Sequence, residues 1–134
     1  PTFSTCFAAP FLVLPPDNYA ELLLELVRRH GTTVWMLNTG WTGGPYGVGQ
    51  RISIAHTRAI VRAIVEGRLD GVTRHLDPVF GLQIPDTVPE VPRRILDPRG
   101  AWKSSDDYDR QAERLKGMFD EYYRTFREKG AAAG

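Results

Sequence analysis

Apolar residues recur with the period of an α-helix in two stretches of the first half of the chain. In residues 17–30 the apolar side chains fall at i, i+3, i+4, i+7 and i+8, which predicts a helix with one buried stripe: Tyr19, Leu22, Leu23, Leu26 and Val27. Gly31 follows as a left-handed C-terminal cap. A second stripe predicts another helix, closed by Gly67: Thr57, Ile60, Val61, Ile64 and Val65.

The pattern predicts a third and longest helix near the C-terminus, capped by Ser104 or Ser105. Its apolar face is spaced alternately by four and three residues: Tyr108, Ala112, Leu115, Phe119, Tyr122 and Phe126. Acidic residues occupy its first turn and basic residues its last, in the sense that the helix dipole favours. Residues 130–134 are expected to form a flexible tail.

Short apolar or alternating runs predict strands between these helices. Residues 32–37 (TTVWML) read as a buried strand, residues 51–54 (RISI) alternate, and 72–76 and 79–84 are short extended pieces. Residues 3–14 fit either a buried strand or a loop through the core, because Pro10 excludes a helix. The order predicts an α/β fold in which an incomplete mixed sheet has flanking helices. With so few strands, the sheet would have two unprotected edge strands. Together with the start at Pro1, this indicates a piece of a longer protein.

Composition narrows the class of function. The chain has 134 residues, and 17 Lys and Arg against 16 Asp and Glu leave a net charge of +1. Such a balance gives no field that would hold nucleic acid or an anionic membrane, and no apolar run is long enough to span a bilayer. The single cysteine, Cys6, excludes an internal disulfide and a multi-cysteine zinc site. It reads as a buried, inert thiol in a reduced compartment, so we expect a cytoplasmic protein.

The most unusual segment is residues 38–49 (NTGWTGGPYGVG), with five glycines between positions 40 and 49. This density predicts several backbone positions with positive φ. Residues 44–51 have the spacing of a phosphate-binding loop, but Gln50 and Arg51 stand where that motif requires Lys and Ser or Thr. The chain's lysines all lie in its last third, so none is close to the loop in sequence. A purely structural turn is the alternative.

Two polar residues after the glycines are candidates for ligand binding. Arg51 can lay its planar guanidinium against a base or pair with a carboxylate, and Thr57 can present a hydroxyl in the first turn of a helix. Spacing alone leaves open that Arg51 forms a surface ion pair and that Thr57 only makes a hydrogen bond at the start of the helix. His30, His56 and His75 have no spacing that suggests a metal site, and no catalytic nucleophile motif is present.

Five collinear segments resemble the C-terminal part of ATP-dependent phosphoenolpyruvate carboxykinase, over nearly the entire chain. The combination of NTGW, GGPYGVG and the run RISIAHTR is highly specific. The matching segments are residues 2–11 (TFSTCFAAPF), 34–49 (VWMLNTGWTGGPYGVG), 51–60 (RISIAHTRAI), 77–82 (DPVFGL) and 95–102 (ILDPRGAW). The resemblance implies that residues 1–134 are the last piece of one mononucleotide-binding carboxykinase domain.

The resemblance also implies an activity and a set of site residues. The family converts oxaloacetate and ATP to phosphoenolpyruvate, ADP and carbon dioxide, with magnesium and manganese, in gluconeogenesis. Residues matching Arg51, Ile52 and Thr57 line its ATP site around the adenine. The family's phosphate loop, metal ligands and oxaloacetate-binding arginines match nothing here, so no catalytic or metal-binding residue is assigned and the isolated chain is expected to be inactive. Its partner would be the remainder of the parent domain.

Two departures and one alternative accompany this interpretation. Gln50 stands where family members often carry Lys, and Ala8 replaces the usual glycine, so one charge near the nucleotide and some backbone freedom are missing. The alternative is a non-catalytic, stand-alone module, derived from that fold, that binds a nucleotide or a partner.

Overall fold

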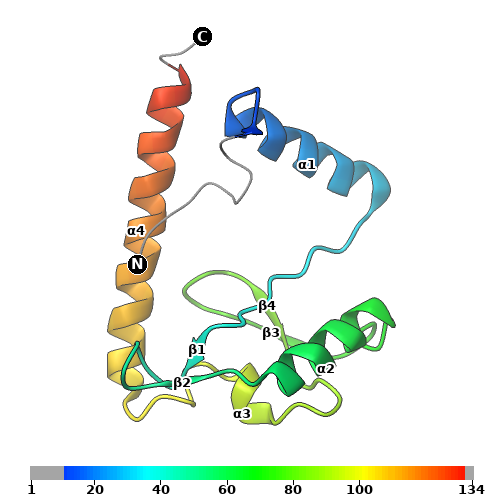
Figure 1. The fold of residues 1–134 in the computed structure, drawn as a ribbon, viewed down its shortest axis with the longest axis vertical. Helices are drawn as coiled ribbons and strands as arrows, with labels where there is room; N and C mark the ends of the chain where they lie inside the picture. The colour runs from blue at the N-terminus through cyan, green and yellow to red at the C-terminus, as the bar shows by residue number, and fades with distance from the viewer. Residues whose placement is uncertain (1–10, 132–134) are drawn as a thin grey trace. The chain divides into compact units, whose positions relative to one another are not determined.

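The computed structural model describes residues 11–131, so the expectations about Cys6, Ala8 and Pro10 lie outside the described part. Its elements follow in the order α1 (Pro16–His30), β1 (Trp41–Thr42), β2 (Gln50–Arg51), α2 (Ile54–Val65), β3 (Arg74–Leu76), β4 (Gln83–Pro85), α3 (Arg93–Leu96) and α4 (Ser105–Ala131) (Figure 1). The chain divides into two compact units. One is Leu37–Lys116, and the other comprises the residues before and after it. None of the described helices combines the length and the apolar character that crossing a membrane requires.

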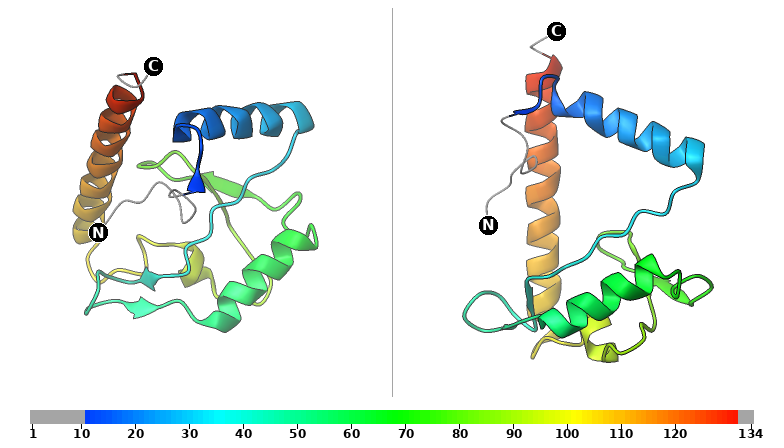
Figure 2. Two further views of the ribbon diagram at one scale, coloured as in Figure 1. Left: turned by 45° about the horizontal axis from the view of Figure 1, so that its top comes forward. Right: turned by 45° about the vertical axis from the view of Figure 1, so that its right-hand side comes forward.

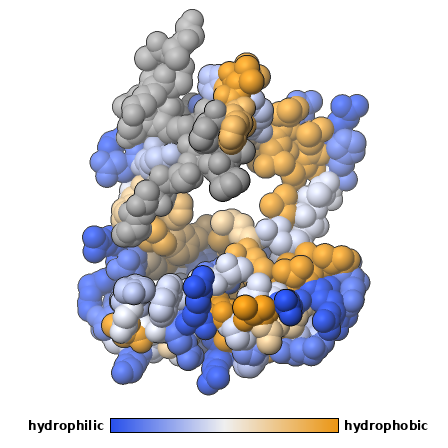
Figure 3. Space-filling model, in the orientation of Figure 1, coloured by the Kyte–Doolittle hydropathy of each residue, from blue (hydrophilic) through white to orange (hydrophobic). Residues whose placement is uncertain are grey.

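Helix α1 confirms the predicted helix but not the predicted burial. It ends at Gly31, which adopts the left-handed conformation with φ 61°. The apolar stripe, however, is exposed: Leu22, Leu23 and Leu26 keep between 40 and 58% of their surface. Figure 3 shows apolar surface, in orange, over α1. The expectation of a buried stripe was wrong because periodicity identifies residues that share a face and not what covers that face.

The strand predicted for residues 32–37 is also wrong, since this segment is assigned no strand. A strand exists only as part of a hydrogen-bonded ladder, and no described segment forms one with it. The described residues contain two separate two-stranded antiparallel sheets, β1–β2 and β3–β4, in place of the expected mixed sheet (Figure 2). The coarser expectation, a mixture of helices and strands, is confirmed.

Only two residues separate β2 from α2, because the second of them, Ser53, caps the helix. The Ser53 hydroxyl accepts a hydrogen bond from the backbone N–H of His56 at 3.2 Å. The strand predicted over residues 51–54 therefore stops at Arg51, and Ile54 is already helical. The buried face of α2 is Ala59, Ile60 and Ala63, whereas Val65 of the predicted stripe is 79% exposed.

The core of the unit Leu37–Lys116 gathers around α2. Leu69, in the turn after α2, is its largest fully buried side chain at 1% exposure. The other buried apolar residues come from α2, from the junction before it, from the segment between β4 and α3, and from the third turn of α4: Ile52, Ala59, Ile60, Ala63, Val88 and Ala112. Three of these seven buried residues are alanines, which let backbone segments approach closely.

Helix α4 is capped by Ser104, one of the two predicted caps. The Ser104 hydroxyl accepts from the backbone N–H of Asp107 at 3.2 Å. In the second turn, Asp109 receives two hydrogen bonds from the guanidinium of Arg99, at 2.8 and 2.9 Å, which fixes the preceding loop to the helix. The helix includes Gly130 and Ala131, the first two residues of the predicted tail; residues 132–134 lie outside the described part, so flexibility there stays a prediction.

The β3–β4 hairpin depends on the buried carboxylate of Asp77. Its Oδ1 accepts from the backbone N–H groups of Val79 and Phe80 at 3.0 and 2.6 Å, and its own N–H donates to the carbonyl of Leu82 at 2.8 Å. The side chain therefore organises the turn between β3 and β4, which are the strands found within or near the extended pieces predicted at 72–76 and 79–84.

Replacing Asp77 with Ala should lower the free energy of unfolding by about 1–3 kcal/mol, because two part-buried N–H groups lose their acceptor. Asp77→Asn is the matched control: its amide oxygen can still accept, so most of the stability should remain. Urea unfolding measures both. Equal losses in the two variants would show that the carboxylate charge, and not the acceptor geometry, matters.

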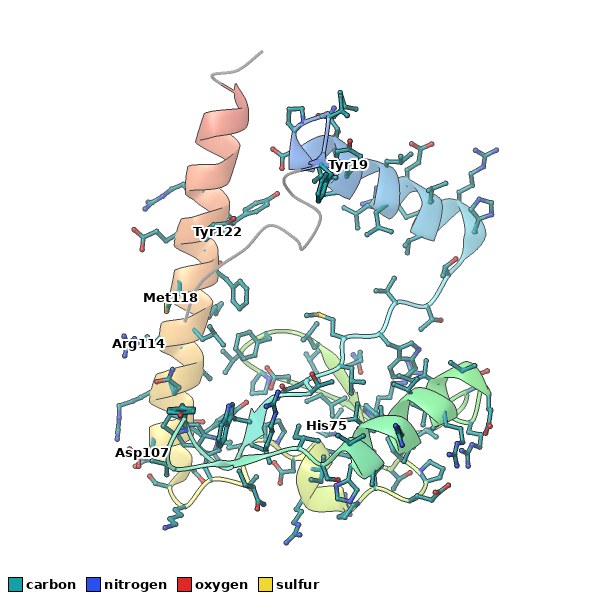
Figure 4. All side chains as sticks on the ribbon, in the orientation of Figure 1. Tyr19, His75, Asp107, Arg114, Met118 and Tyr122 are labelled. Atoms are coloured by element: carbon teal, nitrogen blue, oxygen red, sulfur yellow. The ribbon has the colours of Figure 1, made fainter. Side chains whose placement is uncertain are left out.

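The same hairpin carries a histidine–carboxylate pair. His75 Nδ1 lies 2.7 Å from Asp86 Oδ1 (His75 is labelled in Figure 4). The hydrogen bond from His75, supported by one from Thr73, holds the pKa of Asp86 below its ordinary value of 3.8. Since the folded-state pKa is lowered, the pair's contribution to stability is present above the unfolded value and is lost as pH falls through the lowered one.

We predict that His75→Phe raises the pKa of Asp86 towards 3.8, because a phenyl ring cannot donate the hydrogen bond that is the largest cause of the lowering. A carboxyl-carbon NMR titration of wild type and variant measures this directly. Arg94→Gln removes a cation from α3 and serves as the control for altered net charge. An unchanged midpoint for Asp86 in His75→Phe would contradict the assignment.

Candidate nucleotide-binding site

The glycine-rich segment folds into a hairpin closed by β1 and β2. The strands pair antiparallel with Trp41 opposite Arg51 and Thr42 opposite Gln50. One further hydrogen bond, from the N–H of Ile52 to the carbonyl of Gly40 at 2.9 Å, extends this pairing beyond the strands. These hydrogen bonds hold the two ends of the hairpin, residues 40–42 and 50–52, next to each other.

Asn38 prepares the entrance to the hairpin. Its Oδ1 accepts from the N–H of Gly40 at 2.9 Å, and its Nδ2 donates to the carbonyl of Trp41 at 3.3 Å. An asparagine that binds nearby backbone in this way imitates a turn. The side chain therefore directs residues 38–41 into the hairpin without a longer strand.

The turn requires glycine for two reasons: positive φ angles at some positions and a lack of room for a side chain at another. Gly43, Gly44 and Gly47 have φ of 75°, 152° and 85°, which confirms the predicted positive-φ positions. Gly49 is needed for a different reason. A Cβ there would lie 2.5 Å from the carbonyl oxygens of both Thr42 and Gly44. The backbone folds so closely on itself that a side chain has no room.

The structure places the three predicted site residues around the junction of β2 and α2. Arg51 ends β2 with an exposed side chain, and Ile52 follows at only 8% exposure. Thr57 lies in the first turn of α2, half-buried, with its N–H bonded to the carbonyl of Ser53 at 3.0 Å. Ile52 thus belongs largely to the core, which limits the apolar surface it can offer to a base.

The alternatives left open for these residues are partly resolved. Among the described residues, no carboxylate lies within ion-pair distance of Arg51, so the surface ion pair is not formed there. The side-chain cap of α2 is Ser53 and not Thr57. The Arg51 guanidinium therefore forms no ion pair with a described residue, and the Thr57 hydroxyl does not cap the helix.

Two neighbours of the site were missed in the sequence. Trp41 is the cross-strand partner of Arg51, so the two side chains share a face, and its ring meets that of Tyr46 edge-on at 5.2 Å. His56 is half-buried, and its Nδ1 is buried without a hydrogen-bond partner in the described part. Trp41 is identified as a neighbour of Arg51 by the pairing register of the two strands, which the sequence does not reveal.

The described part offers no group of three His, Cys, Asp or Glu side chains arranged to hold a metal ion. What the junction offers is one free guanidinium, an aromatic ring beside it and a hydroxyl at the start of a helix. These groups suit a planar, hydrogen-bonding ligand such as a nucleotide base.

Comparison with known proteins identifies the family. A family model described as phosphoenolpyruvate carboxykinase, in its ATP form, matches residues 1–94. The chain therefore belongs to the phosphoenolpyruvate carboxykinase family.

Similar proteins cover almost the whole chain. It is 50% identical over 127 residues to phosphoenolpyruvate carboxykinase (ATP) 2 of Moorella thermoacetica, and 53% identical over 128 residues to phosphoenolpyruvate carboxykinase (ATP) 1 of Salinibacter ruber. These alignments cover 95 and 96% of this chain but 24% of each relative. The chain thus spans about a quarter of the length of the curated relatives it matches.

The close backbone approach in the hairpin gives a testable prediction. Gly49→Ala should lower the free energy of unfolding by about 1–3 kcal/mol, because its Cβ collides with two backbone carbonyls that cannot move independently. Gly117→Ala, in α4, is the matched control. Its Cβ meets nothing within 4 Å, and alanine should stabilise the helix by about 0.5–1 kcal/mol. Urea unfolding of both variants decides the question. A Gly49→Ala chain as stable as wild type would show that the hairpin can open without cost.

Proposed function

We propose that the chain forms part of an ATP-dependent phosphoenolpyruvate carboxykinase, which converts oxaloacetate and ATP to phosphoenolpyruvate, ADP and carbon dioxide in gluconeogenesis. The observation that carries this proposal is the identity of about half of all residues with carboxykinases named for ATP, over 95% of the chain. The enzyme is proposed to act in the cytoplasm with magnesium and manganese. Residues outside this chain would hold the metals and oxaloacetate.

Within that enzyme, the junction of β2 and α2 is proposed to form the adenine side of the ATP site. Arg51 would lie against the base, Thr57 would donate or accept a hydrogen bond near it, and Ile52 would support both from the core. The exposed guanidinium and its cross-strand neighbour Trp41 support this role, because a base can stack on a planar cation and on an indole ring.

The chain alone is expected not to turn over. Phosphoryl transfer is catalysed mainly by positioning and by cations around the γ-phosphate. The proposed adenine side of the site, which consists of Arg51, Ile52 and Thr57 and is called the adenine wall below, contacts only the base and supplies neither. The proposed partner is therefore the remainder of the carboxykinase domain, and the exposed apolar face of α1 supports this, since Leu22 and Leu23 would be covered by such a partner.

We predict that ATP, titrated into the full chain, shifts the amide NMR signals of residues 39–57 in a saturable way. Adenosine should shift the same signals and inorganic triphosphate should not, because the wall is proposed to contact the base. Arg51→Ala should weaken ATP binding about tenfold or more, the loss of one contact to a charged group. Arg94→Ala, which removes an exposed arginine from α3, should leave the affinity unchanged.

Two results would contradict the assignment. Equal ATP affinities of wild type and Arg51→Ala would exclude Arg51 from the site. An absence of shifts at millimolar ATP would show that residues 39–57 form no working nucleotide site in this chain. In the complete enzyme, the same substitution should raise KM for ATP and leave KM for oxaloacetate almost unchanged.

A further inference from the structure

A surface pocket of about 500 Å³ lies beside the glycine hairpin, and the proposed adenine wall does not line it. Its walls are residues 43–45 and Val48 of the hairpin, residues 102–104, and side chains from the first three turns of α4. All of these residues belong to the unit Leu37–Lys116, so one compact unit forms the pocket. Neither Arg51 nor Thr57 contributes to it.

The hairpin and the segment before α4 are packed against each other at this pocket. A Cβ on Gly43 would lie 3.1 Å from the carbonyl oxygen of Ala101. This contact brings Lys103, which is far from the glycines in sequence, to the same pocket as Gly43 and Gly44. The glycine-rich loop therefore has a lysine beside it that sequence proximity did not indicate.

The charge in the pocket is strongly unbalanced. Lys103, Arg110 and Arg114 contribute three cations, against the single carboxylate of Asp107. Asp107 and Arg110 neutralise each other, because an Arg110 nitrogen donates to Asp107 Oδ1. Among the described side chains, no carboxylate lies within ion-pair distance of Lys103 or Arg114. Figure 4 labels Asp107 and Arg114 on α4, from which both side chains project. A concave site concentrates the field of such unpaired cations.

Ser104 and Gln111 add two polar side chains to the lining, and its apolar part comes from both segments. Pro45 and Val48 come from the hairpin, and Trp102 comes from the segment before α4. The indole of Trp102 is held edge-on against the ring of Tyr108, with centroids 5.8 Å apart. An apolar surface next to two free cations is the combination that recognises a small organic anion.

We propose that this pocket binds a phosphorylated small molecule whose apolar or aromatic part lies against Trp102. A phosphate monoester carries a charge of about −1.5 to −2 at neutral pH, which matches the two unpaired cations better than a single carboxylate does. Arg114 can meet two phosphate oxygens with its planar fork, and Lys103 supplies a point charge. This site is separate from the proposed adenine wall and does not depend on it.

Phenyl phosphate, which combines a phosphate with an aromatic ring, is the probe. Titrated into the full chain, it should shift the amide NMR signals of residues 43–48 and 102–114 in a saturable way. Lys103→Gln combined with Arg114→Gln should weaken binding at least tenfold. The matched control is Lys116→Gln combined with Arg124→Gln, which removes the same charge from exposed positions of α4 outside the pocket and should leave the affinity unchanged.

Three outcomes would overturn the proposal. The first is the absence of saturable shifts at millimolar phenyl phosphate. The second is equal weakening in both double variants, which would indicate general attraction to a basic surface. The third, independent of any variant, is benzoate binding as tightly as phenyl phosphate. Arg51→Ala should bind phenyl phosphate like wild type, so this result and the ATP titration report on different sites.

Discussion

The hydrogen bond between Ile52 and Gly40 is the constraint on which the rest of the candidate site depends. It closes a hairpin whose own ladder is only two residues long, and a pair that short is not stable in water by itself. Burial of the Ile52 side chain supplies what the ladder lacks, since the same residue is anchored in the core beside α2. Because side chains alternate along a strand, burying Ile52 directs Arg51 outward. The exposed guanidinium is therefore a consequence of the packing of its neighbour.

The close folding of the hairpin follows from the same junction. Gly49 and Gly44 approach each other through backbone atoms alone, which brings the two strands together immediately after the turn. Ser53 then starts α2 without a connecting loop, so Thr57 follows Ile52 within little more than one helical turn. Five glycines and one cap thus convert a long irregular segment into a fixed support for two polar side chains.

The sequence predicts those elements whose ends have a local chemical cause. Gly31 ends α1 and Ser104 caps α4 as expected, because a left-handed glycine and a capping hydroxyl act within one turn of the chain. Residues 32–37 were predicted as a strand because β-branched and aromatic residues favour one, but a strand also requires a partner that local composition cannot supply. Helix α2 shows the same limit of local information. Its apolar stripe predicted the helix correctly, but the stripe did not identify Ala59 and Ala63 as buried, because their burial depends on which other segments pack against the helix. Of the three candidate site residues, the position of Thr57 in the first turn of a helix was predictable; the burial of Ile52 and the pairing of Arg51 with Trp41 depend on register.

Net charge is a poor guide to local fields, and this chain illustrates why. A sum of +1 argues against a protein-wide attraction for nucleic acid, but it places no limit on how charges are grouped once the chain folds. Lys103 is more than fifty residues from the glycines, and the contact between Gly43 and Ala101 brings it to their side. The helical period adds Arg110 and Arg114, which are four residues apart and so lie on one face of α4. A cationic pocket therefore arises from a nearly neutral chain by two ordinary causes, a backbone contact between distant segments and the period of a helix.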